Sequence, residues 1–503
     1  MMALPALSRR ALFILSGFFA LILVSVWTNK LSYDTVETEE ASGRTWTEKL
    51  CMALAHAPQS SHPSQAVLVE HPKYHKVAVA TAFGFHHDVY LTVAWTLKRM
   101  SPNLGSRAPA VHVYAKPPFT YGFQDVVEEL QLYDGVVEDS DHFLDDFERL
   151  SGDDAFDMIV LGTCEFDLRQ DRDWHKRLLA AWDKRDDAHK FKIVCIIHDV
   201  KESEWLPHLP EWTRRNAIRF LPISEHVGKA YKLMMEEMAD SADPVIRSAG
   251  FEYIQYDTHV PILDIPRLPE RKPDHILSNA VIQGAFFSER RDYKQLFKDL
   301  MEDLAKDPSV WGYLPLGDQP SYSVDPQSRS PFHLFLIGSG WLEIPTELKN
   351  IVSMHVDLTY NQFYKMMGEM DICIPAFAGE AYFQHKASST FAMALECDVP
   401  ILVNRRTRAT YTYSDDDRAV VTRPAVMREI AAIRALRTNN ASDFLEGDPT
   451  GTGVPMSANP LMRAAVQDML ARGWQRSKAE FRQFKEDVWR ANEEVMAQIL
   501  RDL

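Results

Sequence analysis

Short, nearly continuous apolar runs alternate with helical segments through most of the chain, and this alternation is the feature that most constrains the fold. In the first half, strand-like runs stand at 76–83, 110–116, 135–138, 156–162, 191–199 and 218–224, and helical segments at 88–100 and 225–239. Strands that are apolar on both faces are typical of parallel sheets covered by helices. The alternation therefore predicts an α/β fold built on a doubly wound parallel sheet.

A proline-rich segment at 260–275 divides this alternation into two halves. After it, strand-like runs stand at 279–287, 332–340, 371–377 and 400–403, and helical segments at 292–305 and 361–370. A chain of 503 residues is too long for one ordinary core,. We therefore expect two tandem doubly wound, Rossmann-like domains, at 75–260 and 275–470. Such sheets bind ligands outside the carboxyl ends of their strands, so we expect the site in the cleft between the domains.

The N-terminus carries a candidate membrane anchor. Arg9 and Arg10 precede 11–27, a stretch of 17 residues without charge. As a helix it would span roughly 26 Å, against about 30 Å of bilayer hydrocarbon. Because arginines stay cytoplasmic, we expect a tail and signal-anchor helix at 1–27, a polar stem at 28–74, and a lumenal remainder. This describes a single-pass type II protein of the Golgi or endoplasmic reticulum; the alternative is a cleaved signal peptide.

The last segment reads as one amphipathic helix. Apolar residues repeat at helical spacing within 471–503, for example Phe481, Phe484, Val488 and Ile499,. We expect this helix to cross back to the first domain. Its aromatic residues are interpreted as packing residues and not as part of a cofactor site.

Charge and cysteine content exclude some classes of protein. The net charge of −16 argues against a nucleic-acid binder, which needs a basic surface,. The five cysteines include no pair at the spacing of a zinc site,. Cys164, Cys195 and Cys373 lie in or beside apolar runs, so we favour buried free thiols. A Cys164–Cys195 bridge between neighbouring strands is the alternative.

The stretch 384–404 suggests a nucleotide site. Ser388, Ser389 and Thr390 open a short predicted helix. A helix N-terminus offers unpaired amide donors and a partial positive charge, which suits a phosphate. Basic residues that could assist the helix dipole are Lys386, Arg290, Arg291 and Lys294.

Glu396 lies two turns further along the same helix. A carboxylate can accept both hydroxyls of a ribose, so we expect a ligand with phosphate and ribose, that is, a nucleotide. The alternative is an ordinary capped helix with a solvated glutamate.

Four motifs in order make the second domain resemble the donor half of a GT-B glycosyltransferase. They are 281–296, 333–340, 356–377 and 382–403. The resemblance implies a GT-B architecture and a nucleotide-sugar co-substrate, with no other cofactor and no metal. The implied donor-binding residues are Gly284, Arg290, Arg291, Lys294, Gly338, Lys386, Ser389, Thr390 and Glu396.

The resemblance assigns roles to these residues. Gly284 would let the donor diphosphate approach the backbone, and Arg291 and Lys294 would stabilise it as a leaving group. The sequence departs from the family at Ser388, where many retaining members have a glutamate. It also departs at Phe286 and Phe287, where an early arginine is usual.

Two strand ends in the first domain carry candidate catalytic groups. Gly84, His86, His87 and Asp88 follow the first strand, and the resemblance implies a histidine base in this loop. We expect His87, or else His86, to deprotonate the acceptor hydroxyl, since a pKa near 7 suits that role. The alternative is a histidine pair that caps a helix.

His198 and Asp199 end a later strand. Asp199 is a further candidate for positioning the acceptor or the sugar, against the alternative of a strand-end turn. A metal-dependent alternative would use Asp139 and Asp141, spaced as Asp-x-Asp. We interpret Asp415–Asp417 as a solvated turn.

We expect a glycosyltransferase of the hexosyltransferase type that moves a sugar to a hydroxyl of a glycan, lipid or protein. One alternative is a GT-B nucleotide-sugar epimerase, which needs no acceptor. Another is a non-catalytic lumenal binding protein, which the serine at position 388 would favour. The sequon at Asn440 is compatible with a lumenal glycoprotein,.

Overall fold

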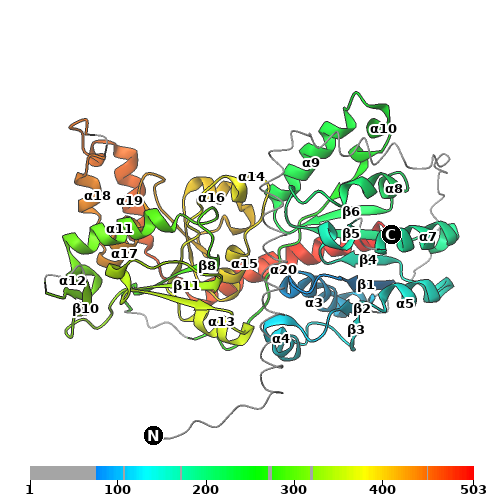
Figure 1. The fold of residues 1–503 in the computed structure, drawn as a ribbon, viewed down its shortest axis with the longest axis horizontal. Coiled ribbons are helices and arrows are strands. Elements are labelled where there is room, and N and C mark those ends of the chain that lie inside the picture. Colours follow the sequence, from blue (N-terminus) through cyan, green and yellow to red (C-terminus); the bar gives the residue numbers. More distant parts are fainter. Residues whose placement is uncertain (1–74, 106–107, 170–172, 270–274, 318–320, 450) are drawn as a thin grey trace, which may run out of the picture. The chain divides into compact units, whose positions relative to one another are not determined.

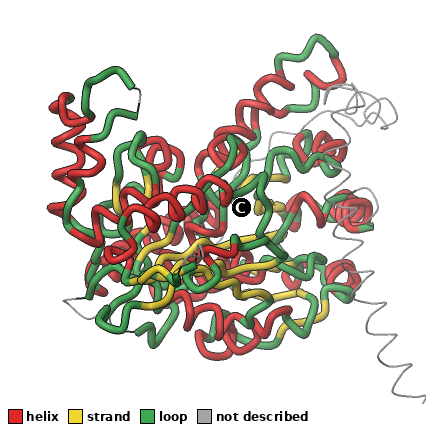
Figure 2. The backbone as a smooth tube through the Cα atoms, turned by 60° about the vertical axis from the view of Figure 1, so that its left-hand side comes forward, coloured by secondary structure: helices red, strands yellow, loops and turns green. Residues whose placement is uncertain are grey.

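The computed structural model describes residues 75–105, 108–169, 173–269, 275–317, 321–449 and 451–503. Two parallel sheets with helices on both sides form its framework (Figures 1 and 2). The predicted anchor and stem, at 1–27 and 28–74, lie outside the described residues. Among the helices that are described, none is long and apolar enough to span a bilayer.

The first sheet has seven strands in the order β3-β2-β1-β4-β5-β6-β7, and all its neighbouring strands are parallel. Its strands are β1 Lys76–Ala80, β2 Ala110–Ala115, β3 Val137–Asp139, β4 Met158–Leu161, β5 Lys192–Ile197, β6 Ile218–Pro222 and β7 Gln255–Tyr256. Residues of β1 and β4 are almost wholly buried. This explains why these strands appear in the sequence as continuous apolar runs.

The second sheet has six strands in the order β12-β11-β8-β13-β14-β15, again all parallel. Its strands are β8 Asn279–Ala285, β11 His333–Ser339, β12 Val352–Val356, β13 Ile372–Cys373, β14 Ile401–Val403 and β15 Val420–Thr422. A separate antiparallel pair joins β9 Tyr313–Pro315 to β10 Tyr322–Val324. Counted along the chain within each sheet, both orders begin 3-2-1-4-5-6, which is the doubly wound Rossmann order. The prediction of two tandem doubly wound domains is confirmed.

Helices connect the strands and cover the sheets (Figure 1). Those of the first domain are α3 His87–Leu104, α4 Phe123–Leu130, α5 Phe143–Arg149, α6 Cys164–Asp167, α7 Trp174–Lys184, α8 Leu209–Thr213, α9 Glu225–Ala239 and α10 Pro244–Arg247. Those of the second are α11 Tyr293–Lys306, α12 Pro308–Trp311, α13 Tyr360–Gly368, α14 Ala381–Gln384, α15 Ser389–Glu396, α16 Arg405–Thr410, α17 Glu429–Thr438, α18 Ser442–Glu446 and α19 Pro460–Arg472.

The last helix, α20 Lys478–Arg501, packs against α3 of the first domain (Figure 1, red and blue). Trp489 meets Trp95 edge to face, with ring centroids 5.3 Å apart. The Arg99 guanidinium lies over both rings and donates to Glu493 at 2.9 Å. A capping box between Ser477 and Glu480 begins the helix,. These contacts fasten the end of the chain to the first sheet.

A disulfide joins Cys164 to Cys195, whose Cα atoms are 5.4 Å apart. Free thiols had been favoured for both residues, so that interpretation is wrong. Strand β4 pairs with β5 in a register that sets Leu161 opposite Cys195, and the turn after β4 returns Cys164 to the same place. Cys373 and Cys397 are buried and lie outside this disulfide.

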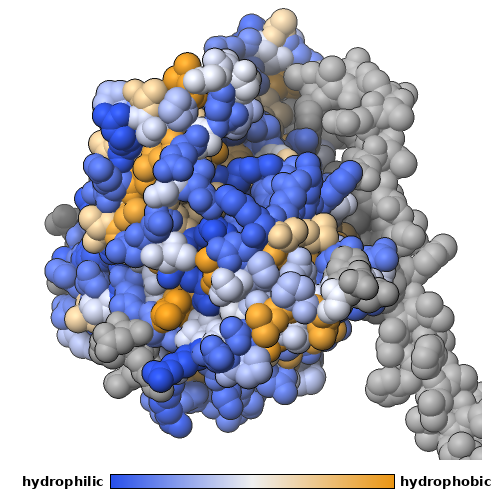
Figure 3. Space-filling view, turned by 90° about the vertical axis from the view of Figure 1, so that its left-hand side faces the viewer, coloured by the Kyte–Doolittle hydropathy of each residue, from blue (hydrophilic) through white to orange (hydrophobic). Residues whose placement is uncertain are grey.

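Hydrophilic residues cover most of the face shown in Figure 3, and apolar residues appear there as scattered patches.

Candidate functional site

Each sheet has one point at which the strand order reverses, and polar residues gather at the carboxyl end of both. In the first sheet the reversal lies between β1 and β4, and in the second between β8 and β13. Ligands of doubly wound sheets bind outside the carboxyl ends of the strands at such points. The loops that follow these strands are therefore the candidate site.

Glycines allow the ends of β8 and β11 to approach closely. Gly284 has a φ of 130°, a conformation that residues with side chains rarely adopt. A Cβ added at Gly338 would lie 1.9 Å from the carbonyl oxygen of Gly284. The two predicted glycines are thus neighbours. The carbonyl of Gly284 fills the space that a side chain at Gly338 would need, and the Arg291 guanidinium lies 3.3 Å from where a Cβ of Gly284 would stand,.

Arg291 ties the end of β8 to the start of α15. Its guanidinium is 3% exposed and donates to Thr390 Oγ1 at 2.8 Å and to Ser388 Oγ at 3.3 Å. The Thr390 hydroxyl in turn donates to the Gln283 carbonyl at 2.9 Å. The rings of Phe377 and Tyr382 lie 4.9 and 5.0 Å from the guanidinium carbon. Arg291 therefore acts as a buried support of the loop.

The remaining donor-binding candidates near the start of α15 and the end of β8 are more accessible. Ser389 and Lys294 are exposed, and Arg290 lies over the Phe287 ring at 5.0 Å. Ser389 begins α15, so its backbone N–H belongs to the unpaired first turn,. The structure thus brings Gly284, Arg291 and Thr390 together below an accessible helix N-terminus.

Lys386 and Asp199 join the carboxyl edges of the two sheets. Lys386 Nζ lies 2.9 Å from Asp199 Oδ2, and His385 Nδ1 lies 3.0 Å from Asp199 Oδ1. The Lys386 carbonyl also contacts His226 Nε2 at 3.0 Å. Burial alone would raise the pKa of Asp199, but its bond to His385 and the charge of Lys386 outweigh burial and lower that pKa to about 2. Asp199 is therefore an ionised anchor.

Glu396 does not face an accessible surface. It is fully buried, and it accepts hydrogen bonds from Leu263 N at 2.8 Å and Tyr364 OH at 3.2 Å. Burial raises its pKa to about 8. Residues 390–396 of α15 are all buried, so the carboxylate at the end of this helix points into protein. The predicted ribose contact is incompatible with this arrangement, and Glu396 instead fastens α15 to the segment between the sheets.

His87 is a structural histidine, and its assignment as the base is wrong. The residue is 1% exposed, and Nδ1 lies 2.9 Å from Tyr90 OH. Nε2 accepts the Thr120 N–H at 3.2 Å and contacts the Thr120 hydroxyl. Burial lowers its pKa to about 4. Both ring nitrogens are thus occupied within the first domain, and neither can accept a substrate proton.

His86 lies at the carboxyl edge and is better placed. It adopts a left-handed conformation with φ 60° before α3, and its ring stacks on His198 with centroids 4.5 Å apart. Among the described residues, its Nδ1 has no hydrogen-bond partner. Burial, followed by the charges of His198, His87 and Lys386, lowers its pKa well below the usual value. His86 is therefore neutral at pH 7, although this lowered pKa departs from the value near 7 expected of the base.

Asp88 does not accompany His86 at the edge. It is buried beside Tyr360, whose OH lies 3.4 Å from Asp88 Oδ1, and burial raises its pKa to about 6. It belongs to the contact between α3 and α13.

Glu165 is a functional candidate that the sequence analysis missed. It follows β4, is 7% exposed, and accepts hydrogen bonds through Oε1 from the backbone N–H groups of His198 and Asp199. Oε2 has no partner among the described residues. Burial raises its pKa to about 8. A carboxylate just after a strand at the switch point was a signal that could have identified it.

Asp139 and Asp141, the alternative metal ligands, both contact a single basic residue, Lys116. Lys116 Nζ lies 3.6 Å from Asp139 and also contacts Asp141. Among the described residues, no group of three or more His, Cys, Asp or Glu is arranged to hold a metal ion.

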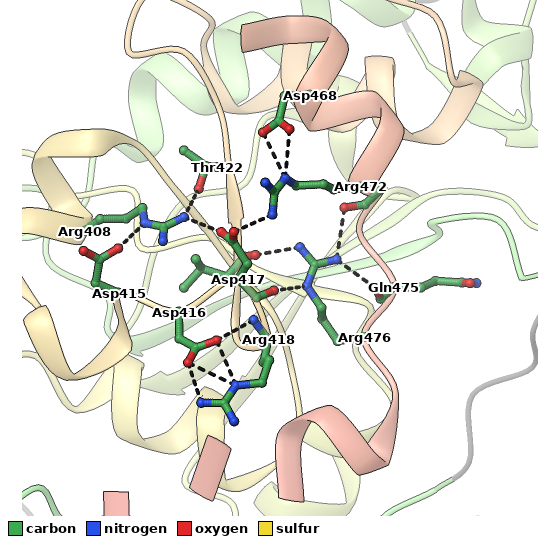
Figure 4. Close-up of polar contacts among 12 residues, drawn as sticks. Arg408, Asp415, Asp416, Asp417, Arg418, Thr422, Asp468, Arg472, Gln475 and Arg476 are labelled. Carbon is green, nitrogen blue, oxygen red and sulfur yellow. Dashed lines mark hydrogen bonds and ion pairs between the residues drawn. The ribbon is translucent and has the colours of Figure 1, made fainter. Parts of the chain in front are cut away.

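Asp415–Asp417 form an ion-pair network and not merely a solvated turn (Figure 4). Asp417 contacts both Arg408 and Arg472, beside a hollow of about 250 Å³. The lining of this hollow includes none of the predicted site residues. Because Asp417 already occupies the space between the two guanidinium groups, we interpret the network as structural.

No family model and no curated protein matches this chain. Solved structures that resemble it include a UDP-forming α,α-trehalose-phosphate synthase from Burkholderia xenovorans, with 9% identity, 85% of this chain and 99% of that chain covered, and a TM-score of 0.41. A UDP-GlcNAc 2-epimerase from Methanocaldococcus jannaschii has 9% identity, coverage of 77% and 99%, and a TM-score of 0.37. The glycotransferase of kitacinnamycin has 13% identity, coverage of 85% and 99%, and a TM-score of 0.34. Such scores are too low to assign a function.

Proposed function

We propose that this chain is a GT-B glycosyltransferase that moves a hexose from a nucleotide sugar to a hydroxyl acceptor without a metal ion. One observation carries the proposal: the carboxyl edges of the two sheets touch through Lys386 and Asp199. One edge holds the end of β8 with Arg291 and Thr390. The other edge holds the loop of His86. Two Rossmann-order sheets whose carboxyl edges meet fit the GT-B architecture,.

The donor diphosphate would lie against Gly284 and the N-terminus of α15. The backbone N–H of Ser389 would donate to it, and Arg290, Lys294 and Lys386 would supply positive charge. Arg291 would hold the loop in place through Thr390 and Ser388. Positive groups fixed where negative charge develops on a departing diphosphate stabilise the transition state.

The acceptor would approach from the first domain. Its hydroxyl oxygen would form the new bond to the anomeric carbon while the bond from that carbon to the diphosphate breaks. His86 would take the hydroxyl proton at Nδ1, with its ring held by stacking on His198. Glu165 and Asp199 would keep the His198 turn in position.

We also propose that the enzyme works in an oxidising compartment, as a single-pass type II protein of the Golgi or endoplasmic reticulum. The Cys164–Cys195 disulfide supports this placement, because such bonds are rare in the reducing cytosol. The proposed anchor at 11–27 lies outside the described residues.

A ligand screen by thermal shift tests the donor assignment. UDP, GDP and ADP are added separately at saturating concentration, and at least one should raise the melting temperature, because only binding to the folded state does so. Release of nucleoside diphosphate from the matching nucleotide sugar should then depend on an acceptor. Release without any acceptor would favour an epimerase. No shift with any nucleotide, in a chain that melts cooperatively, would contradict the proposal.

A further inference from the structure

Exposed aromatic side chains are concentrated at the carboxyl edges of the sheets. Among the residues that the structure describes, five Phe, Tyr or Trp side chains are more than about a third exposed: Phe85, Tyr121, Tyr253, Phe287 and Trp341,. Four of them follow β1, β2, β8 and β11, and only Tyr253 does not lie beyond the carboxyl end of such a strand. Doubly wound sheets bind their ligands at these strand ends, so this distribution points to a ligand at the edges.

The rings around Phe85 form one continuous surface, here named the ring cluster: Phe83, Phe85, His86, Phe166 and His198. The Phe83 centroid lies 5.4 Å from Phe85, 5.0 Å from His86 and 4.8 Å from Phe166. His86 stacks on His198 at 4.5 Å. Phe85 is 41% exposed, and the other members are partly or largely covered.

The ring cluster lies at the switch point of the first sheet. Its members come from the segments after β1, β4 and β5, with Phe166 in the short helix α6, and β1 and β4 flank the reversal of strand order. This is where a doubly wound sheet binds its ligand. The cluster also contains His86, whose buried Nδ1 has no partner among the described residues.

We propose that the ring cluster binds the acceptor and that the acceptor presents a pyranose ring to it. The inference rests on the proposed function and names its substrate class. A pyranose has an apolar C–H face and a rim of hydroxyls. Aromatic faces can pack against the C–H face. His86 Nδ1, Lys386 and Asp199 can form hydrogen bonds with the hydroxyls.

An alkyl chain fits this surface less well. It would cover the imidazole of His86 without offering its Nδ1 a hydrogen bond, and buried polar groups without partners are unfavourable,. A pyranose hydroxyl can pair with this nitrogen. A hydroxyl that faces His86 Nδ1 is then the one that attacks the anomeric carbon and gives up its proton.

Saturation-transfer NMR on the full chain tests this inference. The probes are methyl β-D-glucopyranoside, methyl β-D-galactopyranoside and methyl α-D-mannopyranoside, with 1-hexanol as the alkyl probe and the nucleotides UDP, GDP and ADP in parallel samples. At least one pyranoside should receive saturation through the C–H protons of one ring face. Phe85→Ala should weaken its binding about 3- to 10-fold, the effect expected for one lost stacking contact.

Two further variants make the result specific. Phe85→Tyr keeps the ring and should bind as the parent does. Tyr253→Ala removes an aromatic that is 73% exposed but lies outside the ring cluster, and it should change nothing. Equal pyranoside signals in the parent and in Phe85→Ala would overturn the inference, as would saturation of 1-hexanol alone.

The nucleotide samples separate this inference from the proposed function. If a nucleotide receives saturation and no pyranoside does, the inference fails and the donor assignment stands. If a pyranoside binds through Phe85 and no nucleotide binds, the ring cluster is upheld as a sugar site and glycosyl transfer is contradicted.

Discussion

Lys386 and Asp199 form an ion pair of 2.9 Å that joins the carboxyl edge of one Rossmann-order sheet to that of the other. Asp199 stands at the end of β5 and Lys386 stands just before α15, so the pair connects the proposed acceptor and donor sides. Asp199 is 7% exposed. A charge pair that is this well covered is expected to hold the two edges together and to position the groups beside it.

Removal of the Lys386 side chain should therefore lower the stability of the folded protein. In Lys386→Ala, the Asp199 carboxylate loses the Lys386 ammonium group, and the free energy of unfolding should fall by about 1–3 kcal/mol,. Urea unfolding measures this change. Lys294→Ala is the matched control, since Lys294 is exposed at the start of α11. Equal stability of the two variants would contradict the role of the pair.

His86 and His87 should behave differently although they are adjacent. His86→Ala should lower kcat about 100-fold or more, the usual contribution of a general base, with little loss of stability. His87→Ala should mainly lower the melting temperature, because it leaves Tyr90 and Thr120 without their partner. Steady-state kinetics and thermal melts on both variants check this. A loss of kcat that is larger in His87→Ala than in His86→Ala, with an unchanged melting temperature, would show that His87 and not His86 is the base.

Glu396 should make the protein less stable as the pH rises. Its pKa of about 8 in the folded state lies above the usual value of 4.5, so the folded state holds the proton more tightly than the unfolded state does. Stability from this group is complete below about pH 4.5 and is lost as the pH rises towards 8. The Glu396→Gln variant should show a flatter decline of stability over this window in urea titrations. A decline as steep as the parent's would show that Glu396 is not the group responsible.

The shape of the Arg291 guanidinium group, and not only its positive charge, should be needed to hold the segment after β8 against the start of α15. Arg291→Lys keeps a cation but loses the fork that reaches both Thr390 and Ser388,. We expect it to weaken nucleotide binding about 10-fold, equivalent to the loss of one hydrogen bond to a charged group. Calorimetric titration with the nucleotide found in the thermal screen measures this. Arg291→Lys binding as tightly as the parent would show that the fork is dispensable.

The Cys164–Cys195 disulfide should stabilise the first domain. The bond closes a loop with a sequence separation of 31, for which the loss of unfolded-chain entropy predicts roughly 3–4 kcal/mol. Cys164→Ala should lower the free energy of unfolding by about this amount. Under reducing conditions the parent should approach the variant. If the reductant leaves the free energy of unfolding of the parent unchanged, the disulfide does not form.

The sequence was sufficient for the parts of the fold that are buried on both faces. Strands such as β1 and β4 appear as apolar runs because helices cover both of their faces. The edge strand β12 was missed because it is only partly buried, which leaves no apolar run. Strand β15 at the other edge has only three residues and was also missed.

Site residues could be predicted from the sequence only where their position at the end of a strand is enough to place them at the site. Gly284 lies at the end of β8 and Arg291 follows that strand, and the rule for strand ends placed them near each other. Whether a polar residue faces ligand or protein depends on what packs over it. Glu396 is covered by Leu263 and Tyr364, and His87 by Tyr90 and Thr120. Except for Tyr90, which lies one turn along the same helix as His87, these residues come from segments distant in the sequence, so residue spacing could not reveal their contacts.

A crystal structure of the full chain with the nucleoside diphosphate chosen by the thermal screen tests the central claim most directly. The account predicts that the phosphates lie against Gly284, within hydrogen-bond distance of the Ser389 backbone N–H, with Arg291 still bonded to Thr390. Phosphates bound elsewhere, for example in the arginine-lined hollow beside β15, would contradict it.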